Sequence, residues 1–164
     1  MDHDPDQEGP LGRAPTFDDL IHLCRALNEQ GAKYLVIGGM AIQHHGFLRA
    51  TEDMDLLVDA SPGNIALMQK AMAMLPDNAA SLFDSTDVDT YGVVRVSDEF
   101  MVDLLKSACG VTFEEAIKDV HIRTVQGVDI PFASPRTLLK TKQTFRSKDD
   151  LDRVFLRRIL SEEP

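Results

Sequence analysis

The chain contains 164 residues, of which 43% are hydrophobic and 27% are charged, and its formal net charge is −10. This length suits one domain, because domains most often contain about 100 to 150 residues. No apolar run approaches the roughly 20 residues that a membrane-spanning helix requires. The composition therefore excludes a membrane-spanning protein and favours a soluble globular one.

The charge is unevenly distributed along the chain. Residues 1–132 hold 9 Lys and Arg against 22 Asp and Glu, whereas residues 133–160 hold 8 against 3. An acidic body disfavours nonspecific binding to nucleic acid, while a basic segment can still hold a phosphate chain or one RNA end. Residues 1–8 lack the basic and apolar segments of a secretory signal, which predicts a cytoplasmic protein. We expect Cys24 and Cys109 to be reduced core thiols, since two cysteines make no disulfide framework.

Helices and strands alternate in the first half of the chain. Residues 1–15 are rich in proline, glycine and polar residues, which predicts a flexible tail before a single domain over residues 16–164. Thr16 and Asp19 resemble a helix capping box, and apolar residues then recur at helical spacing as far as Gly31. The next segments are, in order, a buried strand over 34–37, a short helix over 40–45, a strand over 55–58 and an amphipathic helix over 65–75.

Two hairpins and two helices are predicted in the second half. The hairpins pair residues 93–96 with 100–105, and 120–125 with 128–132. The helices cover 135–142 and 149–160, the second with Leu151, Val154, Phe155 and Ile159 on one face. We therefore expect an α/β fold, α+β in detail, with a small mixed sheet backed by helices on one side. Its core covers about 16–133, and its C-terminal helical part covers about 134–164.

One pair of acidic residues is distinguished by its context. The pattern Asp-x-Asp occurs five times, but only Asp53 and Asp55 open an apolar strand. Residues i and i+2 of a strand point to the same side, so these two carboxylates converge. The pair therefore predicts a cation site, the alternative being two turn aspartates that cap a strand.

Asp103 is a candidate third ligand, because it is an acid between apolar neighbours in another predicted strand. If that strand lies beside the first, the three carboxylates can bind two Mg²⁺ ions about 3.5 to 4 Å apart, with Mn²⁺ as a possible substitute. Such a pair of ions suits in-line phosphoryl transfer. The alternative is a hairpin residue that faces outward.

Gly38 and Gly39 follow the first strand, and 13 residues separate them from Asp53. Without Cβ atoms, the backbone here can approach a phosphate closely. Arg49 and Thr51, in the intervening segment, either position phosphate or stabilise the loop. Strand, glycine turn, helix and carboxylate strand, in that order, predict a phosphate-binding turn beside the cation site.

Two segments resemble the signature of the nucleotidyltransferase superfamily, which has the DNA polymerase β-like fold. They are Val36-Ile37-Gly38-Gly39-Met40-Ala41 and His45-Gly46-Phe47-Leu48-Arg49-Ala50-Thr51-Glu52-Asp53-Met54-Asp55-Leu56-Leu57-Val58. The pattern is similar to that of the small bacterial group related to the abortive-infection toxin nucleotidyltransferases, whose C-terminal helices residues 139–152 also resemble. Gly39 replaces a serine that many relatives carry, so one hydroxyl contact to phosphate is absent.

The resemblance implies a Mg²⁺-dependent transfer of a nucleoside monophosphate from an NTP, such as ATP, onto a hydroxyl. It assigns Gly38 and Gly39 to the triphosphate, and Asp53, Asp55 and Asp103 to the metal, with Asp103 also activating the acceptor. Lys142 is implied to bind phosphate, although a basic residue on a solvated helix is a simpler interpretation.

The acceptor favoured by the resemblance is tRNA or a partner protein in a toxin–antitoxin setting, with an antitoxin-type protein as a possible partner. A small molecule such as an antibiotic is the alternative acceptor. A competing hypothesis is a non-catalytic nucleotide- or partner-binding module that retains the fold, because the chain lacks a large acceptor domain.

Overall fold

The computed structural model describes residues 12–144 and 146–162, apart from the side chain of residue 148. Residues 1–11 of the expected flexible tail lie outside the described residues. Residues 12–15 of the tail are described and make defined contacts, since the Arg13 N–H donates to the Glu99 carbonyl at 2.9 Å and Pro15 is buried. The ordered domain thus begins before Thr16.

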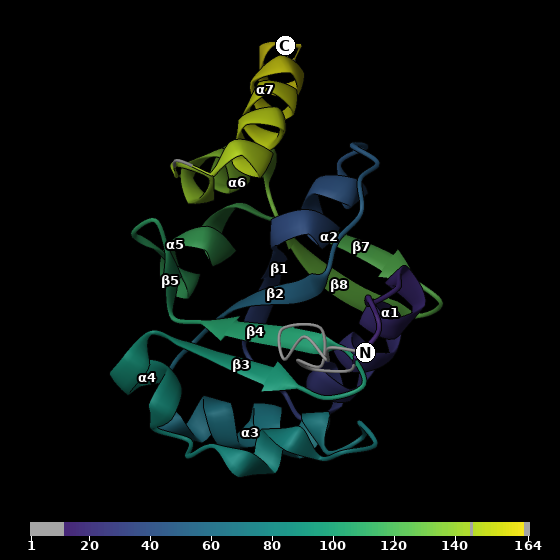
Figure 1. The fold of residues 1–164 in the computed structure, drawn as a ribbon, viewed down its shortest axis with the longest axis vertical. Helices are drawn as coiled ribbons and strands as arrows, with labels where there is room; N and C mark the ends of the chain where they lie inside the picture. The colour runs from purple at the N-terminus through teal and green to yellow at the C-terminus, as the bar shows by residue number, and fades with distance from the viewer. Residues whose placement is uncertain (1–11, 145, 163–164) are drawn as a thin grey trace, which may run out of the picture.

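The centre of the protein is a mixed six-stranded sheet with the order β3-β4-β2-β1-β8-β7 (Figure 1). Its strands are β1 (Tyr34–Ile37), β2 (Asp53–Val58), β3 (Val93–Ser97), β4 (Met101–Leu105), β7 (Val120–Val125) and β8 (Val128–Ala133). The β2–β4 and β1–β8 pairs are parallel, whereas the other neighbours are antiparallel. β5 (Ser107–Ala108) and β6 (Val111–Thr112) form a separate small ribbon. The mixed α/β class and both predicted hairpins are confirmed.

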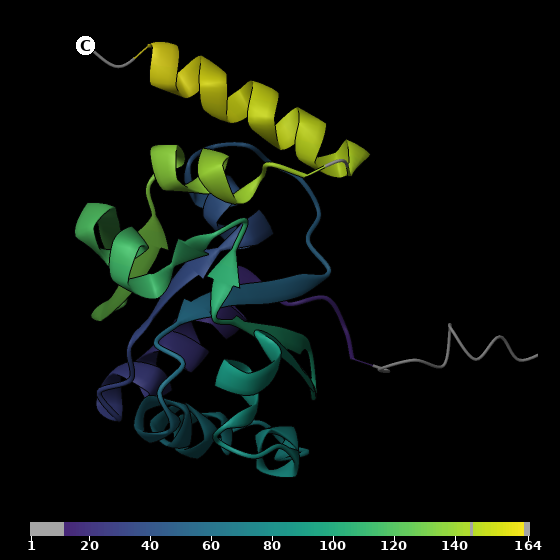
Figure 2. The same ribbon diagram turned by 90° about the vertical axis from the view of Figure 1, so that its left-hand side faces the viewer.

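Seven α-helices and two 3₁₀ turns accompany the described sheet. The helices are α1 (Phe17–Glu29), α2 (Gly38–His44), α3 (Pro62–Met72), α4 (Asp87–Tyr91), α5 (Phe113–Ala116), α6 (Pro135–Thr141) and α7 (Ser147–Ser161), and the 3₁₀ turns cover Ala79–Leu82 and Ile117–Asp119. Figures 1 and 2 show α6 and α7 stacked at one end of the molecule, with α3 at the opposite end. No helix of the described chain is long and apolar enough to cross a membrane.

The predicted start of α1 is confirmed in detail. Thr16 Oγ1 accepts from the Asp19 N–H at 3.2 Å, and Asp19 Oδ2 accepts from the Thr16 N–H at 2.7 Å. This reciprocal capping box satisfies backbone donors that have no partner within the helix. Gly31 follows the helix at φ +70°, a left-handed conformation that suits glycine at a helix end.

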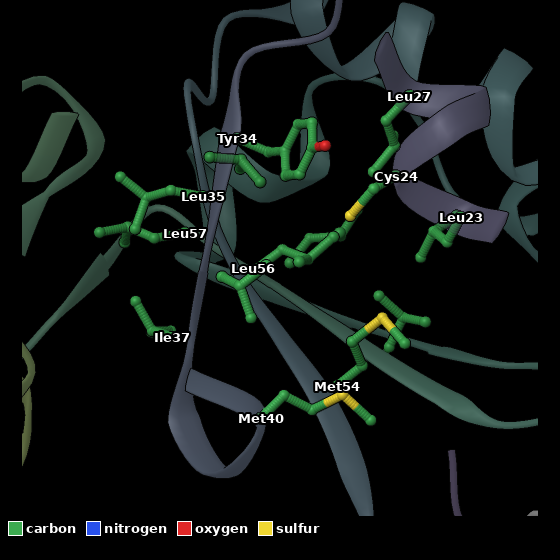
Figure 3. Packing of buried hydrophobic residues seen from close by; sticks show 14 of the residues in the cluster. Leu23, Cys24, Leu27, Tyr34, Leu35, Ile37, Met40, Met54, Leu56 and Leu57 are labelled. Atoms are coloured by element: carbon green, nitrogen blue, oxygen red, sulfur yellow. The ribbon is translucent and has the colours of Figure 1, made fainter. Parts of the chain in front are cut away.

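Figure 3 shows how the core joins helix and sheet. Leu23, Cys24 and Leu27 of α1 point toward Met54 and Leu56 of β2, and all five side chains are fully buried. All four residues of β1 are buried, so the middle of the sheet is covered on both faces, although we expected helices on one side. A strand that is buried on both faces reads as a continuous apolar run, as residues 34–37 do.

The predicted inward face of α7 is wrong in part. Leu151 and Val154 are 64% and 63% exposed, whereas Asp152 and Leu156 are 0% exposed. Phe155 and Ile159 pack against the core as predicted, but two other buried positions of α7 carry aspartates that are neutralised by neighbouring cations. Lys142 is likewise only 5% exposed, so its placement on a solvated helix is wrong.

Smaller differences concern boundaries and one cysteine. β2 begins at Asp53, and α3 covers Pro62–Met72 in place of 65–75, since proline is well suited to the first turn of a helix. Cys24 is buried as expected, but Cys109 is exposed and is not a core thiol. Cys109 lies with Gly110 in the turn between β5 and β6, where its φ is +48°.

Candidate metal centre and phosphate cleft

Three aspartates meet on two adjacent parallel strands. Asp55 of β2 is the register partner of Asp103 of β4, and Asp53 lies two residues earlier on the same side of β2. Each of the three offers a carboxylate oxygen within 4.8 Å of the others. Asp103 therefore lies beside the pair, and the outward-facing alternative for this residue is wrong.

Crowding of these carboxylates changes their proton affinity. Burial raises the pKa of Asp55 to about 7, and the charges of Asp53 and Asp103 act in the same direction. Near neutral pH the cluster therefore holds a proton on Asp55 for part of the time. A divalent cation would relieve the same repulsion, and three converging carboxylates are the oxygen donors that Mg²⁺ and Mn²⁺ take. The residues present thus fit such an ion.

Gly38 allows the backbone to pass directly beside this cluster. Its φ is +69°, and a Cβ atom at this position would lie 2.2 Å from Asp55 Oδ2. The cause is the β1–β2 pairing, which places Ile37 opposite Asp55. We expected Gly38 to allow close approach of a phosphate, but the Asp55 carboxylate occupies the space that a side chain at position 38 would need.

Gly39 is closely packed for a related reason. A Cβ atom here would lie 2.6 Å from Thr51 Oγ1 and 3.3 Å from an Arg49 guanidinium nitrogen. The Thr51 hydroxyl donates to the Asp53 carbonyl at 2.9 Å, which fixes the loop before β2. The Thr51 hydroxyl therefore lies close to the place where a serine at position 39 would carry its own hydroxyl.

The cationic side of the site is held by buried carboxylates of α7. Arg49 Nε lies 2.9 Å from Asp152 Oδ1, and Lys142 Nζ lies 3.2 Å from Asp152 Oδ2 and 3.1 Å from Asp149 Oδ1. Both aspartate side chains are 0% exposed. Burial of Asp149 opposes its ionisation, but hydrogen bonds from Thr144 and Lys142 outweigh this and lower its pKa to about 2. The paired charges therefore fix α7 against the loop that carries Arg49.

An aromatic contact adds to this attachment. The rings of Phe47 and Phe155 stack with their centroids 5.1 Å apart, which joins the same loop to α7. Stacking of this kind contributes about 0.5 to 1.5 kcal/mol beyond burial of the two rings. Arg49 thus stabilises the loop, which was one of its two predicted roles, and it also lines the cleft.

All eight residues predicted from the sequence line one cleft of about 450 Å³. They are Gly38, Gly39, Arg49, Thr51, Asp53, Asp55, Asp103 and Lys142. The cleft therefore has an acidic cluster from the sheet and basic groups from the loop and from α6–α7. Figure 1 shows α6 and α7 over the end of the sheet at which β1 meets α2.

Two arginines that were not assigned to the site from the sequence also line the cleft. Arg146 lines it and donates from Nε to Asp149 at 2.8 Å. Arg95 of β3 is the cross-strand partner of Asp103 and donates to both of its carboxylate oxygens, at 2.8 and 2.9 Å. The sequence could have indicated Arg95 through the pairing of the predicted hairpin, because the register determines which residue of one strand faces Asp103 on the other.

No protein-family model matches the chain, and no curated protein is significantly similar to it.

Proposed function

We propose that this protein is a Mg²⁺-dependent nucleotidyltransferase with a DNA polymerase β-like fold, which moves a nucleoside monophosphate from an NTP onto a hydroxyl group. The observation that carries the proposal is the convergence of Asp53, Asp55 and Asp103 with the Gly38-Gly39 backbone in a single cleft. Separate parts of the chain supply these groups, and the paired strands bring them together. A cleft of about 450 Å³ also lies within the range of small-molecule sites.

The three carboxylates would hold the metal. Bound there, Mg²⁺ would neutralise the triphosphate and the leaving pyrophosphate and would acidify the attacking hydroxyl. Arg49 and Lys142 would contact phosphate oxygens from the other side of the cleft, with Thr51 next to the glycine turn. Their partners Asp149 and Asp152 hold these cations in fixed positions, which lowers the cost of ordering them when a ligand binds.

The proposed transfer is an exchange of bonds at the α-phosphorus of the NTP. The acceptor oxygen forms a bond to the α-phosphorus while the bond to the bridging oxygen breaks and pyrophosphate leaves. The hydroxyl proton passes to the Asp103 carboxylate, which lies at the edge of the triad beside β3. Asp53 and Asp55 would hold the metal during this step.

The acceptor is the part of the proposal that rests most on the resemblance. We favour tRNA or a partner protein in a toxin–antitoxin setting within the cytoplasm, with a small molecule such as an antibiotic as the alternative. The excess of Lys and Arg over residues 133–160 supports an anionic acceptor at the α6–α7 side of the cleft.

Transfer of labelled nucleotide tests the activity. The protein is incubated with Mg²⁺ and each labelled NTP in the presence of cellular RNA, protein or small-molecule pools. We expect label transfer to one pool, and a loss of at least about 100-fold in Asp53→Asn, since even outer-shell partners of metals cost 10- to 100-fold. Asp89→Asn is the matched control, because Asp89 belongs to another Asp-x-Asp pattern and its side chain is 58% exposed. No transfer to any pool, or equal transfer by Asp53→Asn, refutes the proposal.

A second candidate is a non-catalytic module that retains the fold and binds a nucleotide or a partner. The observation that favours it is the pairing of Arg49 and Lys142 with buried aspartates, which leaves less of their charge for a triphosphate. Binding of a partner that is indifferent to NTP and Mg²⁺ would support this module over the enzyme.

A further inference from the structure

The Arg95 guanidinium is in direct contact with two members of the acidic triad. Its Nε donates to Asp103 Oδ1 at 2.8 Å, and its Nη2 donates to Asp103 Oδ2 at 2.9 Å and to Asp53 Oδ2 at 3.0 Å. The contact with Asp103 is bidentate, the geometry in which arginine binds a carboxylate most strongly. A cation therefore already lies against the carboxylates that would hold the metal.

Stability of the fold does not explain this arrangement well. β3 is an edge strand of the sheet, and the Arg95 side chain is 52% exposed. Ion pairs of exposed arginines typically contribute about 0 to 1 kcal/mol, and the bidentate geometry and the 12% exposure of the Asp103 side chain place this pair toward the upper end. Because the side chain is half-exposed, the guanidinium can move into solvent without opening a cavity in the core. The position of this charge therefore matters more for what the triad binds than for folding.

The number of charges at the site limits the number of divalent ions that it can bind. Three carboxylates meet there, and Arg95 offsets one of them. Among the contacts of the described chain, Arg95 donates to Asp103 and Asp53 and not to Asp55. One divalent ion would offset the two negative charges that remain. A second divalent ion would then find no unmatched carboxylate charge while Arg95 stays in place.

We propose that Arg95 fills one of the two cation positions of the triad, so that the nucleotide-free protein binds one divalent ion, and the second position opens when the guanidinium leaves Asp103 and Asp53. Arg95 is then a positioning residue that links metal loading to the arrival of a triphosphate, whose oxygens offer the guanidinium a new partner. The number of cation positions rests on the proposed function only for the existence of a cation site at the triad, whereas the link to a triphosphate rests on the proposed nucleotide as well.

Counting bound Mn²⁺ in the absence of nucleotide tests this inference. Electron paramagnetic resonance reports free Mn²⁺, so a titration gives both the number of bound ions and their affinity. We expect one ion in the wild type and two in Arg95→Gln, with the first bound at least about tenfold more tightly because a like charge has been removed. Arg95→Met serves as a second neutral variant, and circular dichroism shows whether each variant is folded.

The matched control is Arg13→Gln. Arg13 is 45% exposed and also contacts two acidic residues, Asp19 and Glu99, but it lies outside the cleft. This variant should bind one ion with wild-type affinity.

Two ions in the wild type, one ion in both Arg95 variants, or no bound Mn²⁺ in any of the proteins would overturn the inference. Because the titration contains no nucleotide, its outcome is separate from that of the transfer assay. One ion in the wild type and two in Arg95→Gln, together with no transfer to any pool, would refute the enzyme and keep the role of Arg95.

Discussion

Replacing Asp55 with asparagine should stabilise the metal-free protein above pH 7. Burial, together with the charges of Asp53 and Asp103, raises the pKa of Asp55 from 3.8 to about 7. The folded state therefore binds this proton more tightly than the unfolded state, so stability falls as the pH rises from about 4 to about 7, and the full penalty is present above that range. At 1.36 kcal/mol for each pKa unit, the penalty has an upper limit of about 4 kcal/mol.

Relaxation of the partly exposed cluster lowers this value, and we expect Asp55→Asn to gain about 2 to 4 kcal/mol at pH 8 and less at pH 5. Urea unfolding in the presence of a chelator measures the difference at each pH. Asp89→Asn, at an exposed position, should follow the wild type throughout. Addition of Mg²⁺ at pH 8 should stabilise the wild type more than Asp55→Asn. Equal pH dependence of the wild type and Asp55→Asn would refute the proposed crowding of charges.

Three further predictions concern other parts of the molecule. Gly38→Ala should lower the free energy of unfolding by about 1 to 3 kcal/mol and weaken metal binding, because φ is +69° and the Cβ would lie 2.2 Å from a carboxylate oxygen of the triad. Gly63→Ala in α3 is the control, since a Cβ there meets nothing within 4 Å. In urea unfolding this control should be neutral or slightly stabilising. Asp152→Asn should cost about 3 to 5 kcal/mol in the same assay, since it leaves two buried or half-buried cations without their shared carboxylate; a cost below about 1 kcal/mol would contradict the role assigned to this ion-pair network. A thiol reagent should modify Cys109 rapidly and Cys24 slowly, because Cys24 is 0% exposed and burial raises its pKa to about 12, and two equally fast thiols would contradict this difference.

Much of the acidic site could be predicted from the sequence because strand geometry is regular. Asp53 and Asp55 share one side of a strand by the alternation of side chains, and Asp103 was conspicuous as an acid in an apolar run. The neighbouring position of their strands was a hypothesis, and the parallel β2–β4 pair confirms it.

Arg95 was missed because a hairpin register cannot be fixed without knowing where the turn begins. The predicted second strand started at Phe100, but β4 starts at Met101 and pairs it with Ser97. This register places Arg95 directly opposite Asp103, whereas the predicted turn would place Met101 opposite Arg95. A shift of this size changes the partner of every residue in the hairpin.

The inward face of α7 was missed for an energetic reason. Asp149 and Asp152 are fully buried, which hydrophobic patterns treat as impossible for isolated charges. Their burial is tolerated because Lys142, at the end of the preceding helix α6, and Arg49, from the distant loop before β2, neutralise them. Such compensation depends on tertiary contacts and leaves no periodic signal in the helix itself.

Binding of NTP measured by calorimetry with and without Mg²⁺ tests most directly that the triad and the glycine turn form a nucleotide site. We predict binding that requires Mg²⁺, is lost in Asp53→Asn and is retained in Asp89→Asn. Binding that is indifferent to Mg²⁺ and to Asp53→Asn, or no binding of any NTP, would contradict this assignment of the cleft.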